Sequence, residues 1–179
     1  MNGSWLLLIY TVPAQPSRKR ATVWREVKKA GAVYLRDGVC VLPEQPARVA
    51  AFEAIEAKVK ELGGQATLVR SARLERERAE AIMAEATAAR AAEYDDILRE
   101  IGRFESHMRR ERQHREFTFA ECQELEADIG KLQRWAGQVK ERDFAGLEKG
   151  QDVDDALAQC EAELTPLAEE AHEQAEREL

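Results

Sequence analysis

Five basic side chains near the start of the sequence have the type and spacing that phosphate binding requires. They are Arg18, Lys19, Arg25, Lys28 and Lys29. Arg18, Arg25 and Lys29 recur at the spacing of one helical face. A cation that contacts a nucleic-acid phosphate releases counterions, so each contact adds salt-dependent affinity. We therefore expect these residues to bind nucleic acid. The alternative is a solvated helix face without a ligand, because charged side chains are mostly exposed.

A second basic cluster lies near the end of a long predicted helix. Its members are Arg109, Arg110, Arg112 and Arg115. The guanidinium group presents a fork of N–H donors that matches oxyanions, so these residues are candidates for oxyanion binding. Glu111 and Glu116 dilute the positive charge of the cluster. The alternative is therefore surface ion pairing along the helix.

Metal binding has one weak candidate on the same helix. His107 and His114 are seven positions apart with Glu111 between them, which places all three on one helical face. Exposed histidines on a charged helix usually have no such role, so we expect no metal and no cofactor.

The three cysteines, Cys40, Cys122 and Cys160, stand at apolar positions of predicted strands and helices, and no CxxC motif occurs. This pattern predicts buried, reduced thiols rather than a redox sensor. With no secretory signal and no apolar run of membrane-spanning length, it indicates a cytoplasmic protein.

Residues that could carry out catalysis do not form a recognisable arrangement. The sequence has no Gly-rich phosphate loop, no paired catalytic carboxylates and no nucleophile motif. A nuclease built on this kind of sheet would need an acidic residue after the first strand, where Thr11, Val12 and Pro13 stand. We therefore expect a protein that is not an enzyme.

The elements that position the first basic cluster are strands and helices in alternation. Residues 5–12 are an almost uninterrupted apolar run, which predicts a central strand buried on both faces. Asp37-Gly38 between two β-branched runs predicts a hairpin. Helices are predicted over residues 18–30 and 46–62, and a last strand over residues 66–70. This β-α-β-β-α-β order predicts an α+β fold with a ferredoxin-like domain over residues 1–73.

The first predicted helix has specific expectations for its ends and its buried face. Ser17 is a favourable N-cap residue, and Gly31 suits the end of the helix. Val23 and Val27 form the apolar stripe with Trp24 at its edge. We expect the indole of Trp24 to be buried against the sheet.

From residue 74 onward the sequence predicts three long helices in an antiparallel bundle, ending at residue 179. Thr118 and Glu121 have the spacing of a capping box, and Phe117 could add a hydrophobic staple. Pro166 is expected to kink the last helix or to restart it with Thr165 as a new N-cap. Residues 1–73 carry 12 Lys and Arg against 6 Asp and Glu, whereas residues 74–179 carry 15 against 28. Only the first part is therefore suited to meet a polyanion.

Several segments together resemble a known family. In the first part they are Trp5 to Leu8, Trp24 to Ala32, and the hairpin Leu35 to Val39 closing at Leu42-Pro43. In the helical part they are Phe117 to Glu121, Leu132 to Trp135, Arg142 to Phe144, and Cys160-Glu161. With these segments the sequence resembles the N-terminal region of the ChrB family of chromate-resistance regulators. The first part is also similar to the ferredoxin-like module of repressors of phenylacetate degradation and of CRISPR adaptation nucleases.

The resemblance implies a cytoplasmic, DNA-binding transcriptional regulator of chromate resistance that responds to chromate and forms a homodimer. Its expected partners are the operator of a chromate-resistance operon and chromate as an effector, with no membrane. Longer members of the family carry a further C-terminal domain, and the sequence ends at Leu179. If sensing depends partly on that domain, we expect this chain to lack that part. The competing interpretation is a non-catalytic protein-interaction or scaffold module whose basic face is incidental.

Overall fold

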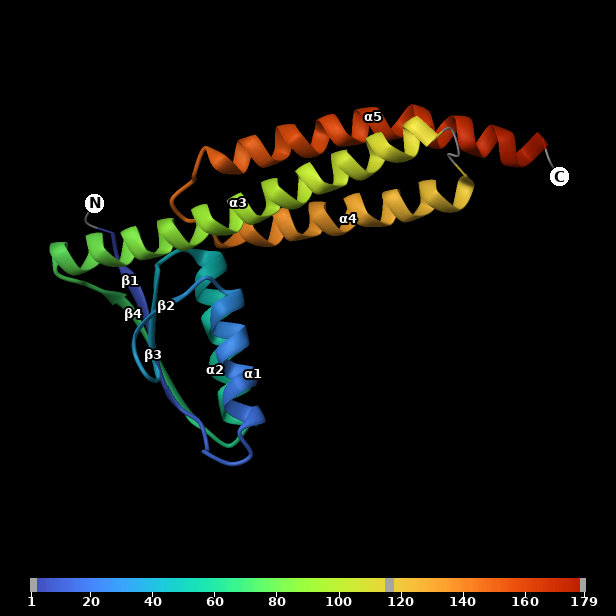
Figure 1. Cartoon of the computed structure of the whole chain (residues 1–179). Helices are drawn as coiled ribbons and strands as arrows, with labels where there is room; N and C mark the ends of the chain where they lie inside the picture. Colours follow the sequence, from blue (N-terminus) through green and yellow to red (C-terminus); the bar gives the residue numbers. More distant parts are fainter. Residues whose placement is uncertain (1–2, 115–117, 178–179) are drawn as a thin grey trace. The chain divides into compact units, whose positions relative to one another are not determined.

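The computed structural model describes residues 3–114 and 118–177, and the chain divides into two compact units (Figure 1). One unit holds the chain up to Ala88 together with Arg142–Ala145. The other holds Ala89–Glu141 and the chain from Gly146 onward. The predicted α+β fold is confirmed. The predicted division between residues 73 and 74 stays a prediction.

A four-stranded antiparallel sheet organises the first unit. Its strands are β1 (Trp5–Thr11), β2 (Val33–Arg36), β3 (Val39–Pro43) and β4 (Gln65–Ala72). The spatial order is β2-β3-β1-β4, so β1 lies in the interior of the sheet and pairs with β3 and β4. The predicted interior position of the first strand is therefore confirmed.

Side chains of β1 alternate between two apolar clusters, one on each face of the sheet. Leu6 and Leu8 are fully buried in the cluster that includes Phe52. Trp5 belongs to the cluster on the other face, with Ile82. The later part of the strand departs from the prediction, because Ile9 is 43% exposed. The prediction of a strand buried on both faces thus holds only for its first half.

The predicted hairpin connects β2 and β3 through Asp37 and Gly38. Gly38 has φ of 71°, a conformation in which an L side chain is strained. Its carbonyl accepts a hydrogen bond of 2.7 Å from the backbone N–H of Tyr10. The turn therefore lies directly against the end of β1.

Helices α1 (Arg18–Lys29) and α2 (Pro46–Glu61) lie side by side along one face of the sheet (Figure 1). Both helices end at glycines, as predicted for the first: Gly31 has φ of 74° and Gly63 has φ of 80°. Ser17 stands at the N-cap position of α1, as predicted, but its side chain does not cap the helix. Its backbone has helical φ and ψ angles, and its hydroxyl makes no capping hydrogen bond.

Helix α3 (Arg76–His114) contributes to both compact units. Ile82 and Ala86 pack with Trp5 on the sheet, whereas Ile97 and Ile101 belong to the core of the second unit. Tyr94, which the sequence analysis did not single out, is 1% exposed in that second core. One continuous apolar stripe of α3 therefore contributes side chains to the apolar clusters of both units.

Helices α4 (Phe119–Arg142) and α5 (Lys149–Arg177) complete the second unit. The capping box at the start of α4 is confirmed. Glu121 accepts a 2.8 Å hydrogen bond from the backbone N–H of Thr118, and the Thr118 hydroxyl accepts one from the N–H of Glu121. The bond from the Thr118 backbone, and after it a 2.9 Å bond that the Thr118 hydroxyl donates to the same carboxylate, hold the pKa of Glu121 below its usual value. The proposed staple residue Phe117 lies outside the described residues.

Helix α5 continues through Pro166. The predicted restart with Thr165 as an N-cap is wrong, because its hydroxyl donates a 2.8 Å hydrogen bond back to the carbonyl of Glu161. That is the bond of a threonine in the interior of a helix. Apolar contacts on both sides of the proline, from Leu164 and Ala168, accompany the continuous helix.

Candidate nucleic-acid interface

Most basic residues of α1 are exposed and have no ion-pair partner among the described residues. Arg18, Arg25, Lys28 and Lys29 are exposed, and Arg20 is exposed beside them. The exposure of Arg20 differs from what its position suggests, because residue 20 falls within the apolar stripe of the helix. Within the described ranges, no side chain of α1 takes part in an ion pair, and Glu26 is the only acidic residue of the helix. The exposed face of α1 therefore carries a local positive charge that its own unit does not neutralise.

Other basic side chains of the same unit are engaged with carboxylates. Lys58 lies 2.9 Å from Glu61, and Lys60 lies 2.8 Å from Glu56. Arg70 of β4 pairs with Glu53 of α2. The contrast distinguishes α1 from an ordinary charged helix face, whose cations usually find neighbours at i+3 or i+4.

Lys19 differs from the other basic residues of α1, because it is bound to the fold itself. Its Nζ donates a hydrogen bond of 2.9 Å to the carbonyl oxygen of Leu62, the C-cap residue of α2. The last carbonyls of a helix have no partner within the helix, so this bond satisfies one of them. Lys19 joins the ends of two helices and is less available to a ligand than its neighbours.

We expect Lys19→Met to lower the free energy of unfolding by about 1 kcal/mol, because one hydrogen bond to a helix-end carbonyl is lost. Lys29→Met is the matched control, since Lys29 is exposed. Chemical denaturation of both variants is the measurement. Equal stabilities of the two variants would contradict a structural role for Lys19.

Trp24 corrects a sequence-based expectation. Its side chain is 52% exposed, so the indole is not buried against the sheet. Val23 and Val27 point into the core, and α2 flanks α1 on the side of Lys19. Trp24 lies on the flank of α1 that faces away from α2. The Nζ of Lys28 lies 6.0 Å from the centroid of its ring, at the limit of a cation–π contact.

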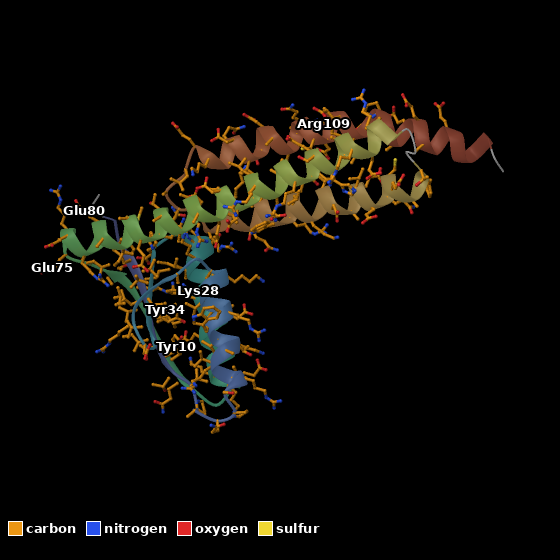
Figure 2. All side chains as sticks on the ribbon, in the orientation of Figure 1. Tyr10, Lys28, Tyr34, Glu75, Glu80 and Arg109 are labelled. Atoms are coloured by element: carbon orange, nitrogen blue, oxygen red, sulfur yellow. The ribbon has the colours of Figure 1, made fainter. Side chains whose placement is uncertain are left out.

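The second basic cluster is partly described. Arg109, Arg110 and Arg112 of α3 are exposed, and Arg109 is labelled in Figure 2. Arg115 lies outside the described residues. Arg110 lines an open groove of about 480 Å³ between α3 and α4, with Arg103 on the same helix and Lys131 on α4. The groove also contains Glu100 and Asp128, which pair with Arg103 and Lys131 respectively. Its charge is therefore mixed.

Two of the three candidate metal ligands have described side chains. His107 and Glu111 pair at 3.4 Å, and the side chain of His114 is outside the description. Across residues 3–114 and 118–177, the structure contains no group of three or more potential ligands placed to hold a metal ion.

Cys40, Cys122 and Cys160 are buried free thiols, as the sequence predicted. Burial raises the pKa of the Cys40 thiol to about 12. Burial, with Glu105 close to the sulfur, raises the pKa of Cys160 to about 12 as well. These thiols are protonated near neutral pH, and the thiolate is the reactive form.

Two tyrosines form a polar pair under the helices. The hydroxyl groups of Tyr10 and Tyr34 lie 2.7 Å apart, pointing toward one another across β3 (Figure 2). Burial raises the pKa of both phenols. Each hydroxyl thus satisfies the other at the half-buried end of the α1–α2 core.

Among the described residues, no helix combines the length and the apolar character needed to cross a bilayer.

The fold and the α1 surface together define a class: a mixed α+β protein that presents a helix with unneutralised positive charge. The chain belongs to the ChrB family, because the family model described as Protein ChrB, N-terminal, matches residues 20–178.

One curated relative supports this assignment over a short stretch. Protein ChrB of Cupriavidus metallidurans is 44% identical over 43 residues, which is 24% of this chain and 13% of the relative. The match thus spans about an eighth of the relative's length. No solved structure matches the chain significantly.

Proposed function

We propose that this chain is a DNA-binding regulator of chromate resistance, active as a homodimer in the cytoplasm and responsive to chromate. The observation that carries the proposal is the exposed cationic face of α1, which has no ion pairs within the described residues. Membership of the ChrB family supports a regulatory role in chromate resistance. Arg18, Arg25, Lys28 and Lys29 are the proposed phosphate contacts. Lys19 is the fifth candidate and the weakest, because its Nζ is bound to Leu62.

We also propose that the sheet unit is a ferredoxin-like domain and that α3, α4 and α5 form an antiparallel bundle. The order of elements and the antiparallel sheet support the first proposal. An apolar core shared by the three helices supports the second. Arg109, Arg110 and Arg112 remain candidates for binding the chromate oxyanion, since their guanidinium groups are accessible.

A retardation assay tests the proposed function directly. The probe is a duplex that contains the promoter of a chromate-resistance operon, titrated with the wild-type chain at low salt with and without chromate. We expect retardation that weakens steeply with added salt and an affinity that chromate changes. The competing scaffold function predicts no retardation at any salt concentration.

A further inference from the structure

Trp24 stands out because a large aromatic side chain is half exposed on a helix face whose other exposed side chains are mainly cationic. Among the large apolar side chains with marked exposure, which include Ile9, Val69 and Phe119, it is the most exposed at 52%. It lies in the middle of α1, with more than one turn of helix on either side. Its position is therefore fixed by regular structure rather than by a loop.

The surroundings of Trp24 are cationic. Arg20 and Lys28 lie one turn before and one turn after it on the same face, since residues four apart are neighbours on a helix. Glu26 lies about 200° around the helix from Trp24, which places its carboxylate on another side. Arg25, adjacent in sequence, adds a further exposed guanidinium group. The indole of Trp24 is thus flanked by exposed cationic side chains.

An exposed indole beside several cations favours one class of binding partner over others. A nucleic acid offers flat aromatic bases at a regular distance from phosphates, so one helix face can meet both at once. Apolar side chains of DNA-binding proteins insert at base steps while neighbouring cations hold the backbone. The positive charge around Trp24 is complementary to phosphates. Among the described residues of α1, no second exposed apolar side chain of comparable size extends the surface into a protein-binding patch.

We infer that Trp24 is the base-contacting residue of the α1 surface: its indole packs against a nucleic-acid base while the flanking Arg20, Arg25 and Lys28 contact phosphates. The inference rests on the proposed DNA binding and assigns separate tasks to the residues of that surface. Charged residues supply affinity that depends on salt, and Trp24 supplies affinity that does not.

The test uses the full chain and a duplex promoter fragment with Trp24→Ala, Trp24→Phe and the control Phe119→Ala. Phe119 is also an exposed aromatic, 37% accessible, but lies in the second unit. Trp24→Ala should weaken binding about fivefold to a hundredfold, the range for loss of one stacked base. The slope of log affinity against log salt should stay at the wild-type value. Trp24→Phe should recover part of the loss, and Phe119→Ala should bind like wild type.

Two further readouts make the result decisive. Thermal melting should show that Trp24→Ala stays folded at the assay temperature, because about half of the indole is already exposed. DNA should change the tryptophan fluorescence of wild type more than that of Trp24→Phe, because Trp5 is buried and Trp135 is partly buried against the core of the second unit. Wild-type affinity in Trp24→Ala would overturn the inference while leaving DNA binding intact. Loss of the dimer in sedimentation by the same variant would also overturn it, because Trp24 would then be a subunit contact. A wild-type chain that fails to bind DNA would overturn the proposed function itself.

Discussion

Replacing Phe52 with alanine is expected to lower the free energy of unfolding by about 3–5 kcal/mol, the range for removing a buried phenyl ring. Phe52 is fully buried on α2 and belongs to the cluster that includes Leu6, Leu8 and Val27. The cavity left behind would lie between sheet and helices, where these well-packed neighbours can only partly collapse into it. For a chain of this size, the loss would lower the melting temperature by roughly 6–20 °C.

Phe119→Ala is the matched control for Phe52→Ala, since it removes the same atoms from a site that is 37% exposed. We expect it to change stability much less. Denaturant titration of both variants gives the comparison. A small loss for Phe52→Ala, no greater than that of the control, would contradict the packing of α2 on the sheet.

Gly38→Ala is expected to destabilise the protein by at least about 1–3 kcal/mol, the cost of a non-glycine residue in a strained backbone conformation. The φ of 71° is one cause. The other is steric, because a Cβ at Gly38 would lie 2.4 Å from the carbonyl oxygen of Tyr10. That oxygen belongs to the backbone of β1, so the hairpin or the strand would have to move.

Gly102→Ala makes the same chemical change as Gly38→Ala, but we expect it to stabilise the protein. Gly102 lies within α3, and a Cβ there would meet nothing within 4 Å. Alanine in a helix interior stabilises relative to glycine by about 0.5–1 kcal/mol. Thermal melting of the two variants should therefore shift in opposite directions. A shift in the same direction would show that the turn at Gly38 is not held as described.

The order of elements in the sheet unit was predictable from local sequence signals. Asp37-Gly38 marks the hairpin, and Gly31 and Gly63 end the two helices because each adopts positive φ. The capping box of Thr118 and Glu121 was equally predictable, since both partners lie within four residues. In each case the interaction that decides the structure is local in sequence.

Features that depend on distant contacts were not predictable in the same way. Trp24 lies at the edge of an apolar stripe, and only the placement of α2 on the other flank leaves it exposed. The apolar period of α3 continues without a break, although Ile82 packs on the sheet and Ile97 packs in the second unit. Periodicity reports which face is buried and contains no information about what covers it.

The candidate interface was likewise only partly visible in the sequence. Spacing predicted that Arg18, Arg25 and Lys29 share an exposed face of α1, and the three side chains are exposed. The bond from Lys19 to Leu62 joins residues 43 positions apart, so no local pattern signals it. The absence of ion pairs on α1, within the described part of the chain, depends equally on which elements lie nearby.

The salt dependence of DNA binding by two double variants tests the central claim most directly. Arg25→Ala with Lys29→Ala removes two charges from the free face of α1. Lys58→Ala with Lys60→Ala removes the same net charge from α2, where both lysines pair with glutamates. If α1 binds phosphates, the first variant should bind more weakly than wild type, and its slope of log affinity against log salt should be shallower by about one unit per lost contact. The second variant should keep a slope close to that of wild type. Equal slopes for the two variants would contradict the claim, because binding would then follow net charge rather than the surface of α1.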